Sequence, residues 1–312
     1  MKKRYVLAAA FAVLALSLTA CSPAGNSSGG GSKVIKIGFI TKFPVDFYDT
    51  MVQAAKDWDA KTPGAELVFS QGKSGTDDES EINAIQADIT LGVKAIAITP
   101  TSPNVKGALQ KAVDAGIKVV LIDNDIPDWD GKSAVVATDN LAGGKLAGAY
   151  LAKTLKPGAK IAVLQGVLGN PSLDDRVTGM IAGLGSGFTI VSKTPTDCDQ
   201  TKGLNAGQDV LTANPDLDAI YSACGPPITG ALQAVKAAGK EGKLVTVGFD
   251  ASPDEVKAIA GGTETASVAQ FPSKMGSLGA QTAFDAASGK KVDAKVDTGT
   301  ELVTKDNVSQ FQ

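Results

Sequence analysis

Histidine is absent from this sequence of 312 residues. Its absence excludes Ser-His-Asp and Cys-His nucleophiles, the usual zinc ligand sets and the commonest general base of enzymes. An enzyme of this composition would have to use carboxylates or lysines instead. Cysteine is also scarce, with three residues and no Cys-x-x-Cys motif. We therefore expect no metal site.

Positive charge is in short supply, because 30 lysine and arginine residues stand against 33 aspartate and glutamate residues. Without Lys2, Lys3 and Arg4, 27 basic residues remain and the net charge is −6. Nucleic-acid binding needs a basic face. No nucleic-acid partner is expected.

Phosphate-binding motifs are incomplete. Gly72–Ser74 reads GKS but lacks the earlier glycine of a P-loop, since that position is Leu67. The glycines of residues 183–187 follow a predicted helix, not a strand, so they do not form a dinucleotide fingerprint. We expect no cofactor.

Long hydrophobic runs are lacking at the start of the chain. The apolar stretch over residues 5–18 is shorter than the roughly 20 residues that a membrane-spanning helix needs. Preceded by Lys2, Lys3 and Arg4, it predicts a secretory signal peptide over residues 1–20, which is removed from the mature protein.

The sequence Leu-Thr-Ala-Cys at residues 18–21 resembles the lipobox of bacterial lipoproteins, whose cysteine is diacylated. We accordingly interpret Cys21 as lipidated and residues 21–33, which are rich in Gly and Ser, as a flexible tether. The protein would then be secreted and anchored to the outer face of the cytoplasmic membrane. The alternative is an ordinary signal peptide with an unrelated cysteine.

Apolar runs that alternate with segments of helical period make up the remaining 280 or so residues, enough for two domains. Residues 77–92 and 101–116 are predicted helices; in the second, Ser102 is the cap, Pro103 the first helical residue and Gly116 the end. This order predicts an α/β fold with two parallel sheets covered by helices on both faces. The predicted strands are 34–40, 65–69, 95–99, 119–122, 134–137, 161–164, 188–191, 219–222, 244–247 and 265–269.

Polar residues follow many of these strands, where parallel sheets bind ligands. They include Thr41, Lys42, Asp123, Asn124, Gln165, Ser222, Cys224, Asp250 and Gln270. A neutral polyhydroxy compound needs paired acceptors and donors, because each buried hydroxyl both gives and takes hydrogen bonds. Carboxylates would accept and Asn124, Arg176 and Gln270 would donate. Phe47, Tyr48 and either Phe43 or Trp129 would present flat aromatic faces to the C–H groups of the ligand.

Together, several segments give the chain a resemblance to the sugar-binding lipoproteins of ABC transporters, the ribose-, galactose- and xylose-binding class with the type I periplasmic binding fold. They are DFYDTMVQAAKDW, AIAITPTSPNV, AGIKVVLID, VATDNLAGGKLAG, LDDRVTGM, TDCDQTKGL, VTVGFDASPDEVKAI and ASVAQFP. The resemblance implies two similar lobes joined by three crossings and closing on a sugar. It places lobe one at 34–138 plus 271–299 and lobe two at 139–270 plus 300–312.

The family's binding residues transfer to this chain position by position. The aromatic pair matches Phe47 and Tyr48, and Asn124 stands where the ribose binders have arginine. An asparagine of those proteins is Val45 here, with Asp46 beside it as a substitute. The predicted site comprises Asp46, Phe47, Tyr48, Asp123, Asn124, Arg176, Cys224, Asp250 and Gln270. Asp139 and Asn140 are interpreted as a helix cap, and capping the helix at Pro253 is the alternative role of Asp250.

Cysteines replace two family residues, a stacking phenylalanine at Cys198 and an asparagine at Cys224. In the family both positions point into the pocket, which implies that a disulfide between them is within reach. Two buried free thiols are the alternative. These departures argue against ribose itself and favour another monosaccharide or a sugar alcohol.

The resulting prediction is a monomeric, non-enzymatic binding protein that delivers a monosaccharide or sugar alcohol to ABC permease and ATPase subunits. A carbohydrate-sensing receptor is an alternative. A glycosidase is a further one, because Asp123 and Asp250 would face each other across a cleft. We expect donors such as Arg176 to lower the pKa of these carboxyls, which disfavours acid catalysis. A repressor would need an N-terminal DNA-binding motif where this chain has a signal and tether.

Overall fold

The structure is a computed structural model that describes residues 34–311. The predicted signal peptide (1–20), the lipidation of Cys21 and the tether (21–33) lie outside the described residues. Within residues 34–311, no helix is both long and apolar enough to cross a membrane.

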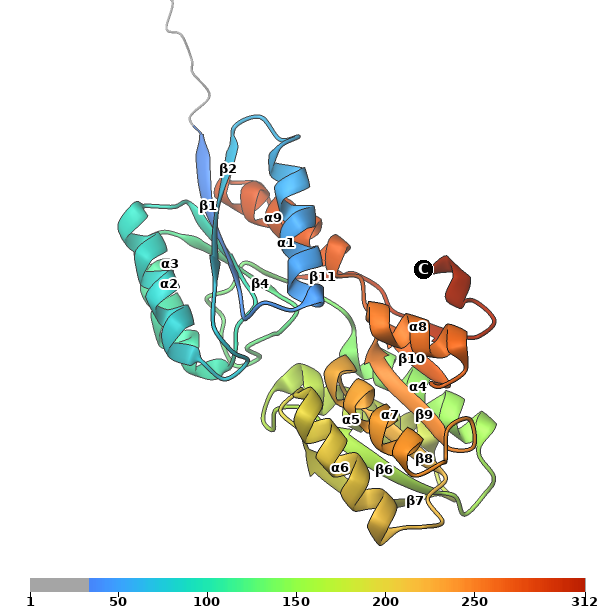
Figure 1. The fold of residues 1–312 in the computed structure, drawn as a ribbon. Coiled ribbons are helices and arrows are strands. Elements are labelled where there is room, and N and C mark those ends of the chain that lie inside the picture. Colours follow the sequence, from blue (N-terminus) through green and yellow to red (C-terminus); the bar gives the residue numbers. More distant parts are fainter. Residues whose placement is uncertain (1–33, 312) are drawn as a thin grey trace, which may run out of the picture. The chain divides into compact units, whose positions relative to one another are not determined.

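The first sheet has six parallel strands in the order β11-β5-β4-β3-β1-β2. Its strands β1, β2, β4 and β11 are labelled in Figure 1. Val119 and Leu121 pack on one face of β4, whereas Val120 and Ile122 pack on the other, as expected for a strand buried on both sides. Its strands are β1 (Ile35–Thr41), β2 (Ala65–Gln71), β3 (Ala95–Ile98), β4 (Lys118–Ile122), β5 (Ala134–Ala137) and β11 (Lys295–Asp297).

The second sheet repeats this order as β12-β10-β9-β8-β6-β7. All of its pairs are parallel except β10 with β12, which is antiparallel. Its strands are β6 (Lys160–Gln165), β7 (Thr189–Pro195), β8 (Ala219–Ser222), β9 (Val245–Asp250), β10 (Ala266–Ala269) and β12 (Glu301–Thr304).

Helices cover both faces of each sheet. Side chains of α1 and α9 share one apolar cluster with the first sheet, and side chains of α2 and α3 share another. On the second sheet, α4 and α5 cover one face while α6 and α7 cover the other. The helices are α1 (Asp46–Asp59), α2 (Asp78–Leu91), α3 (Lys106–Asp114), α4 (Asn140–Thr154), α5 (Pro171–Leu184), α6 (Gln200–Ala213), α7 (Gly225–Ala237), α8 (Pro253–Gly261) and α9 (Pro272–Ala287), with 3-10 turns η1 (Pro103–Val105) and η2 (Val308–Gln310).

Three passages of the chain connect the two sheets. They run from β5 to α4, from β10 to α9 and from β11 to β12, because α9 packs on the first sheet although it follows β10 of the second. The predicted fold class is therefore confirmed. Among the described strands, only β11 and β12 are not predicted from the sequence. The 3-10 turn η1 replaces the first turn of the helix predicted at Pro103.

Candidate ligand-binding site

A cavity of about 390 Å³ opens at the carboxyl ends of strands from both sheets. This volume falls within the roughly 300–1,000 Å³ of small-molecule sites. All nine residues predicted for the site line it, and Asp46 among them is exposed. The other eight are Phe47, Tyr48, Asp123, Asn124, Arg176, Cys224, Asp250 and Gln270.

Asp123 follows β4 and is 5% exposed. Its φ of 66° is left-handed, a conformation that aspartate tolerates better than most residues. Tyr48 Oη donates to Oδ2 at 3.1 Å and Asn124 Nδ2 donates to the same oxygen at 2.6 Å. Within residues 34–311, Oδ1 accepts no hydrogen bond, so one carboxylate oxygen has its acceptor capacity free. Burial, together with the Asp123 carboxylate, raises the pKa of Tyr48 well above its usual value.

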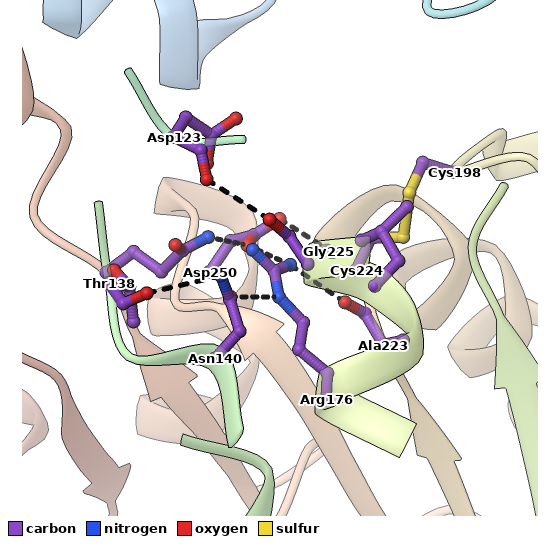
Figure 2. Close-up of polar contacts among 12 residues, drawn as sticks. Asp123, Thr138, Asn140, Arg176, Cys198, Ala223, Cys224, Gly225 and Asp250 are labelled. Carbon is purple, nitrogen blue, oxygen red and sulfur yellow. Dashed lines mark hydrogen bonds and ion pairs between the residues drawn. A yellow bond between two sulfur atoms is a disulfide. The ribbon is translucent and has the colours of Figure 1, made fainter. Parts of the chain in front are cut away.

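Asp250, the last residue of β9, also has a positive φ of 101°. Its Oδ1 accepts from Gln270 Nε2 at 2.7 Å and from Arg176 Nη1 at 3.2 Å, and its Oδ2 accepts from the Gly225 amide at 3.0 Å (Figure 2). The pKa of Asp250 is nevertheless raised, because burial penalises the charge more than Arg176 and the hydrogen bonds stabilise it. Arg176, Gln270 and the Gly225 amide act in the expected direction, but the expectation of a lowered pKa is wrong for Asp250 because burial outweighs them.

Arg176 projects from α5 and is 4% exposed. Its Nε donates to Asn140 Oδ1 at 2.8 Å, its Nη1 donates to the Ala223 carbonyl at 2.9 Å, and its guanidinium stacks on the Phe249 ring at 4.0 Å. The position of α5 is fixed by its close packing against α4, since a Cβ on Gly144 of α4 would lie 2.2 Å from the Arg176 carbonyl oxygen. Asn140 thus does more than begin a helix, whereas Asp139 caps α4 as predicted.

Gln270 is buried at the end of the second sheet's β10 and keeps an acceptor free. Its Nε2 donates a hydrogen bond to Asp250, but its Oε1 is buried and has no hydrogen-bond partner within the described range. A buried acceptor without a partner is costly, so this oxygen is suited to a hydroxyl donor from a ligand. The alternative in which Asp250 caps α8 is wrong, because Ser252 caps that helix and Asp250 binds the start of α7.

Lys42 is the main cavity residue that is absent from the site predicted from the sequence. It directly follows β1, lines the cavity and is 7% exposed. Burial lowers its pKa, against the opposing effect of the Asp123 and Glu81 carboxylates. Its position after a strand was the available signal. Phe43 lines the cavity, whereas Trp129 is packed between α3 and the first sheet and donates to Gln110, so its proposed role is wrong.

Cys198 and Cys224 form a disulfide in the structure, with their Cα atoms 5.7 Å apart. Both residues line the cavity. Among residues 34–311 there is no group of three or more side chains able to hold a metal ion.

The comparisons with known proteins agree with this geometry. Residues 37–291 match the family described as "Periplasmic binding protein domain", and the chain belongs to this family. The ribose import binding protein of Salmonella typhimurium is 38% identical over 221 residues, which are 70% of this chain and 74% of that protein.

Two solved structures of ABC transporter solute-binding proteins superpose on most of the chain. The protein from Agrobacterium vitis with bound D-fucose has a TM-score of 0.84 and 32% identity, and the match covers 88% of this chain and 97% of that one. The protein from Bacillus halodurans with bound myo-inositol has a TM-score of 0.84 and 25% identity, with 90% and 98% covered. The resemblance to type I periplasmic binding proteins is confirmed.

Proposed function

We propose that this protein captures a neutral monosaccharide or a sugar alcohol in the cavity and delivers it to an ABC importer outside the cytoplasmic membrane. The observation that carries the proposal is that Asp123 and Asp250, at the ends of strands in different sheets, line one cavity. A ligand that bonds both carboxylates must connect the two sheets. Residues 34–138 with 271–299, and residues 139–270 with 300–312, are the two lobes of this proposal.

The free hydrogen-bonding capacity of the cavity supports a polyhydroxy ligand. Asp123 Oδ1 and Gln270 Oε1 are acceptors without a partner from residues 34–311, and the Lys42 ammonium is a donor in the same wall. Vicinal hydroxyls both donate and accept, which matches this mixture. Phe43, Phe47 and Tyr48 pack edge to face and offer apolar surface for C–H groups. The relatives with ribose, D-fucose and myo-inositol in their names favour the same class.

The proposal includes no chemistry and no cofactor. In place of a catalytic pair, Asp250 is held by an arginine, an amide side chain and a backbone N–H. Membership of a family of periplasmic binding proteins supports the capture and release of a ligand without a reaction. The glycosidase alternative predicts free product from a labelled glycoside, and we expect none.

Anchoring completes the proposal. Cys21 would carry lipid and residues 21–33 would tether the binding domain as a monomer beside permease and ATPase subunits in other chains. A sensing receptor remains the second candidate, because ligand capture by the same cavity would serve a signalling partner equally well.

A thermal-shift screen of pentoses, hexoses and polyols tests the function. A ligand at 100 times its Kd raises the free energy of unfolding by about 2.7 kcal/mol. We expect at least one compound to raise the melting temperature, with micromolar or tighter binding in calorimetry and no turnover. A screen in which no sugar or polyol binds would overturn the proposal.

A further inference from the structure

The disulfide lies beside Arg176 and Asp250, a charged pair of the second lobe that lines the cavity. Cys224 directly precedes α7, and Cys198 lies between β7 and α6, 26 residues earlier in the chain. Figure 2 shows the bridge next to Gly225 and Ala223, close to the Arg176 and Asp250 side chains. The bridge thus joins the cavity wall to the segment that contacts both charges.

The two backbone neighbours of Cys224 each hold one of these charges. The Ala223 carbonyl accepts from Arg176 Nη1 at 2.9 Å, and the Gly225 amide donates to Asp250 Oδ2 at 3.0 Å. Arg176 and Asp250 are also bonded to each other at 3.2 Å. A displacement of residue 224 therefore moves both supports of the ion pair together.

Cys224 occupies the N-cap position of α7 and makes no cap hydrogen bond. The amides that an N-cap side chain normally satisfies, at the second and third helical positions, are missing here because Pro226 and Pro227 have no N–H. The free amide at the start of the helix is that of Gly225, and it donates to the Asp250 carboxylate. This bond links the start of α7 to a residue of the cavity.

At the other end of the bridge, Asp197 and Cys198 have left-handed φ values of 50° and 54°. Such backbone persists only where the surroundings hold it in place. The bond to Cys224 is a direct constraint on this loop, and both residues line the cavity.

We propose that the Cys198–Cys224 disulfide is a positioning element for the Arg176–Asp250 pair, so that affinity for the ligand depends on the bridge being intact. The inference rests on the proposed function, because it needs a bound sugar or polyol as its readout. The bridge acts through the Ala223 carbonyl and the Gly225 amide and does not contact the ligand as a donor or acceptor.

The test compares oxidised and reduced protein. The full chain carries Cys21→Ser, so that only the two bridge cysteines remain. Tris(2-carboxyethyl)phosphine reduces the bridge to two thiols and becomes the phosphine oxide with oxygen from water. The probe is whichever of D-ribose, D-allose, D-fucose and myo-inositol binds the oxidised protein most tightly. Calorimetry well below the melting temperature should show at least about a fivefold loss of affinity on reduction.

Variants separate positioning from general stability. Reductant should not change the Kd of the Cys198→Ser/Cys224→Ser protein, which has no bridge. On reduction, Asp250→Asn should lose less affinity than the parent protein, because its contact with Gly225 is already altered. Asp123→Asn, in the other lobe, should lose as much as the parent protein, since independent sites are additive.

Two results would overturn the inference, and a third would overturn the proposed function on which it rests. Equal Kd values for oxidised and reduced protein, with only a lower melting temperature, would reduce the bridge to a structural role and leave the proposed function intact. An equal loss in Asp250→Asn and Asp123→Asn would also overturn it. If none of the four probes, nor any compound of the wider screen, binds the oxidised protein, the proposed function itself fails.

Discussion

Two aspartates at strand ends carry the chemistry of the cavity, and both have a backbone that few residues adopt. Asp123 and Asp250 have φ values of 66° and 101°. Left-handed residues of this kind cost free energy and cluster at functional sites. In each case the unusual backbone turns the chain sharply after a buried strand, with the carboxylate lining the cavity.

Replacing either carboxylate by an amide should weaken ligand binding. Asparagine tolerates positive φ, so Asp123→Asn and Asp250→Asn keep the turn while they replace an acceptor by a donor. We expect affinity to fall by about 5- to 150-fold, the equivalent of roughly 1–3 kcal/mol for an unsatisfied buried group. Calorimetry measures the change. Asp128→Asn, on an exposed loop outside the cavity lining, is the control, and normal binding by both cavity variants would move the site elsewhere.

Glu255 is a buried carboxyl behind the turn of Asp250. Its oxygens accept from the Ser252 amide at 2.9 Å and from Ser267 Oγ at 2.7 Å, and Ser267 in turn accepts from the Ala251 amide. Burial, with the nearby Asp250 carboxylate, raises the pKa of Glu255 from 4.5 to about 8. Between these pH values the folded protein holds a proton that the unfolded chain has lost.

The free energy of unfolding should therefore fall as pH rises from 4.5 to about 8, by at most about 1.4 kcal/mol per pH unit for this group. Glu81 and Asp88, whose pKa values are raised to about 7 and about 6, act in the same direction. Glu255→Gln should make this decline shallower in urea unfolding at pH 5 and pH 8. Glu241→Gln, at an exposed position, should not. Equal slopes in the parent and Glu255→Gln would contradict the assignment.

At the scale of elements, glycines allow α4 and α5 to pack backbone against backbone. A Cβ on Gly148 would lie 2.0 Å from the Met180 carbonyl, and one on Gly179 would lie 2.2 Å from the Leu141 carbonyl. Since backbone cannot yield as a flexible side chain does, the helices would have to separate. Arg176 on α5 would move with them.

Gly148→Ala should consequently destabilise the protein by roughly 1–3 kcal/mol, as overpacking does. Gly107→Ala in α3 is the matched control, because no atom other than its chain neighbours and the nearby backbone of its own helix lies within 4 Å of the added Cβ. It should be neutral or stabilising by up to about 1 kcal/mol, from helix propensity. Chemical denaturation measures both, and equal effects of the two substitutions would contradict the packing argument.

At the scale of the whole molecule, the three passages between the sheets allow a ligand in the cavity to tie the two halves together. The halves already touch there, because Ser172 Oγ of α5 donates to the Asp123 carbonyl at 3.3 Å. The same molecule is proposed to be anchored to the membrane through a lipid on Cys21, which lies outside the described residues.

Cys21→Ser should release the protein from the membrane. In cells that process lipoproteins, the parent chain should sediment with membranes and enter the detergent phase, whereas the variant should be found in the soluble fraction. Ligand affinity should stay the same in both. Membrane association that survives Cys21→Ser would contradict lipidation at this residue.

The repeating order of strands and helices can be read from local sequence, and so can the residues that follow each strand. Ten apolar runs predicted strands because burial on both faces leaves a local signature. Strands β11 and β12 left none, since Lys295–Asp297 and Glu301–Thr304 are short and partly polar and are strands only through pairing with β5 and β10. The positions of Asp123 and Asp250 at strand ends were equally readable.

The surroundings of those residues, by contrast, depend on which elements the fold brings together. Asn140, Arg176 and Asp250 meet although they are far apart in the chain, and burial at that meeting point reverses the expected direction of the Asp250 pKa shift. The burial of Lys42 in the cavity wall likewise depends on neighbours from other elements. Local patterns record period and polarity, whereas desolvation and hydrogen-bond partners are set by which elements the fold brings together.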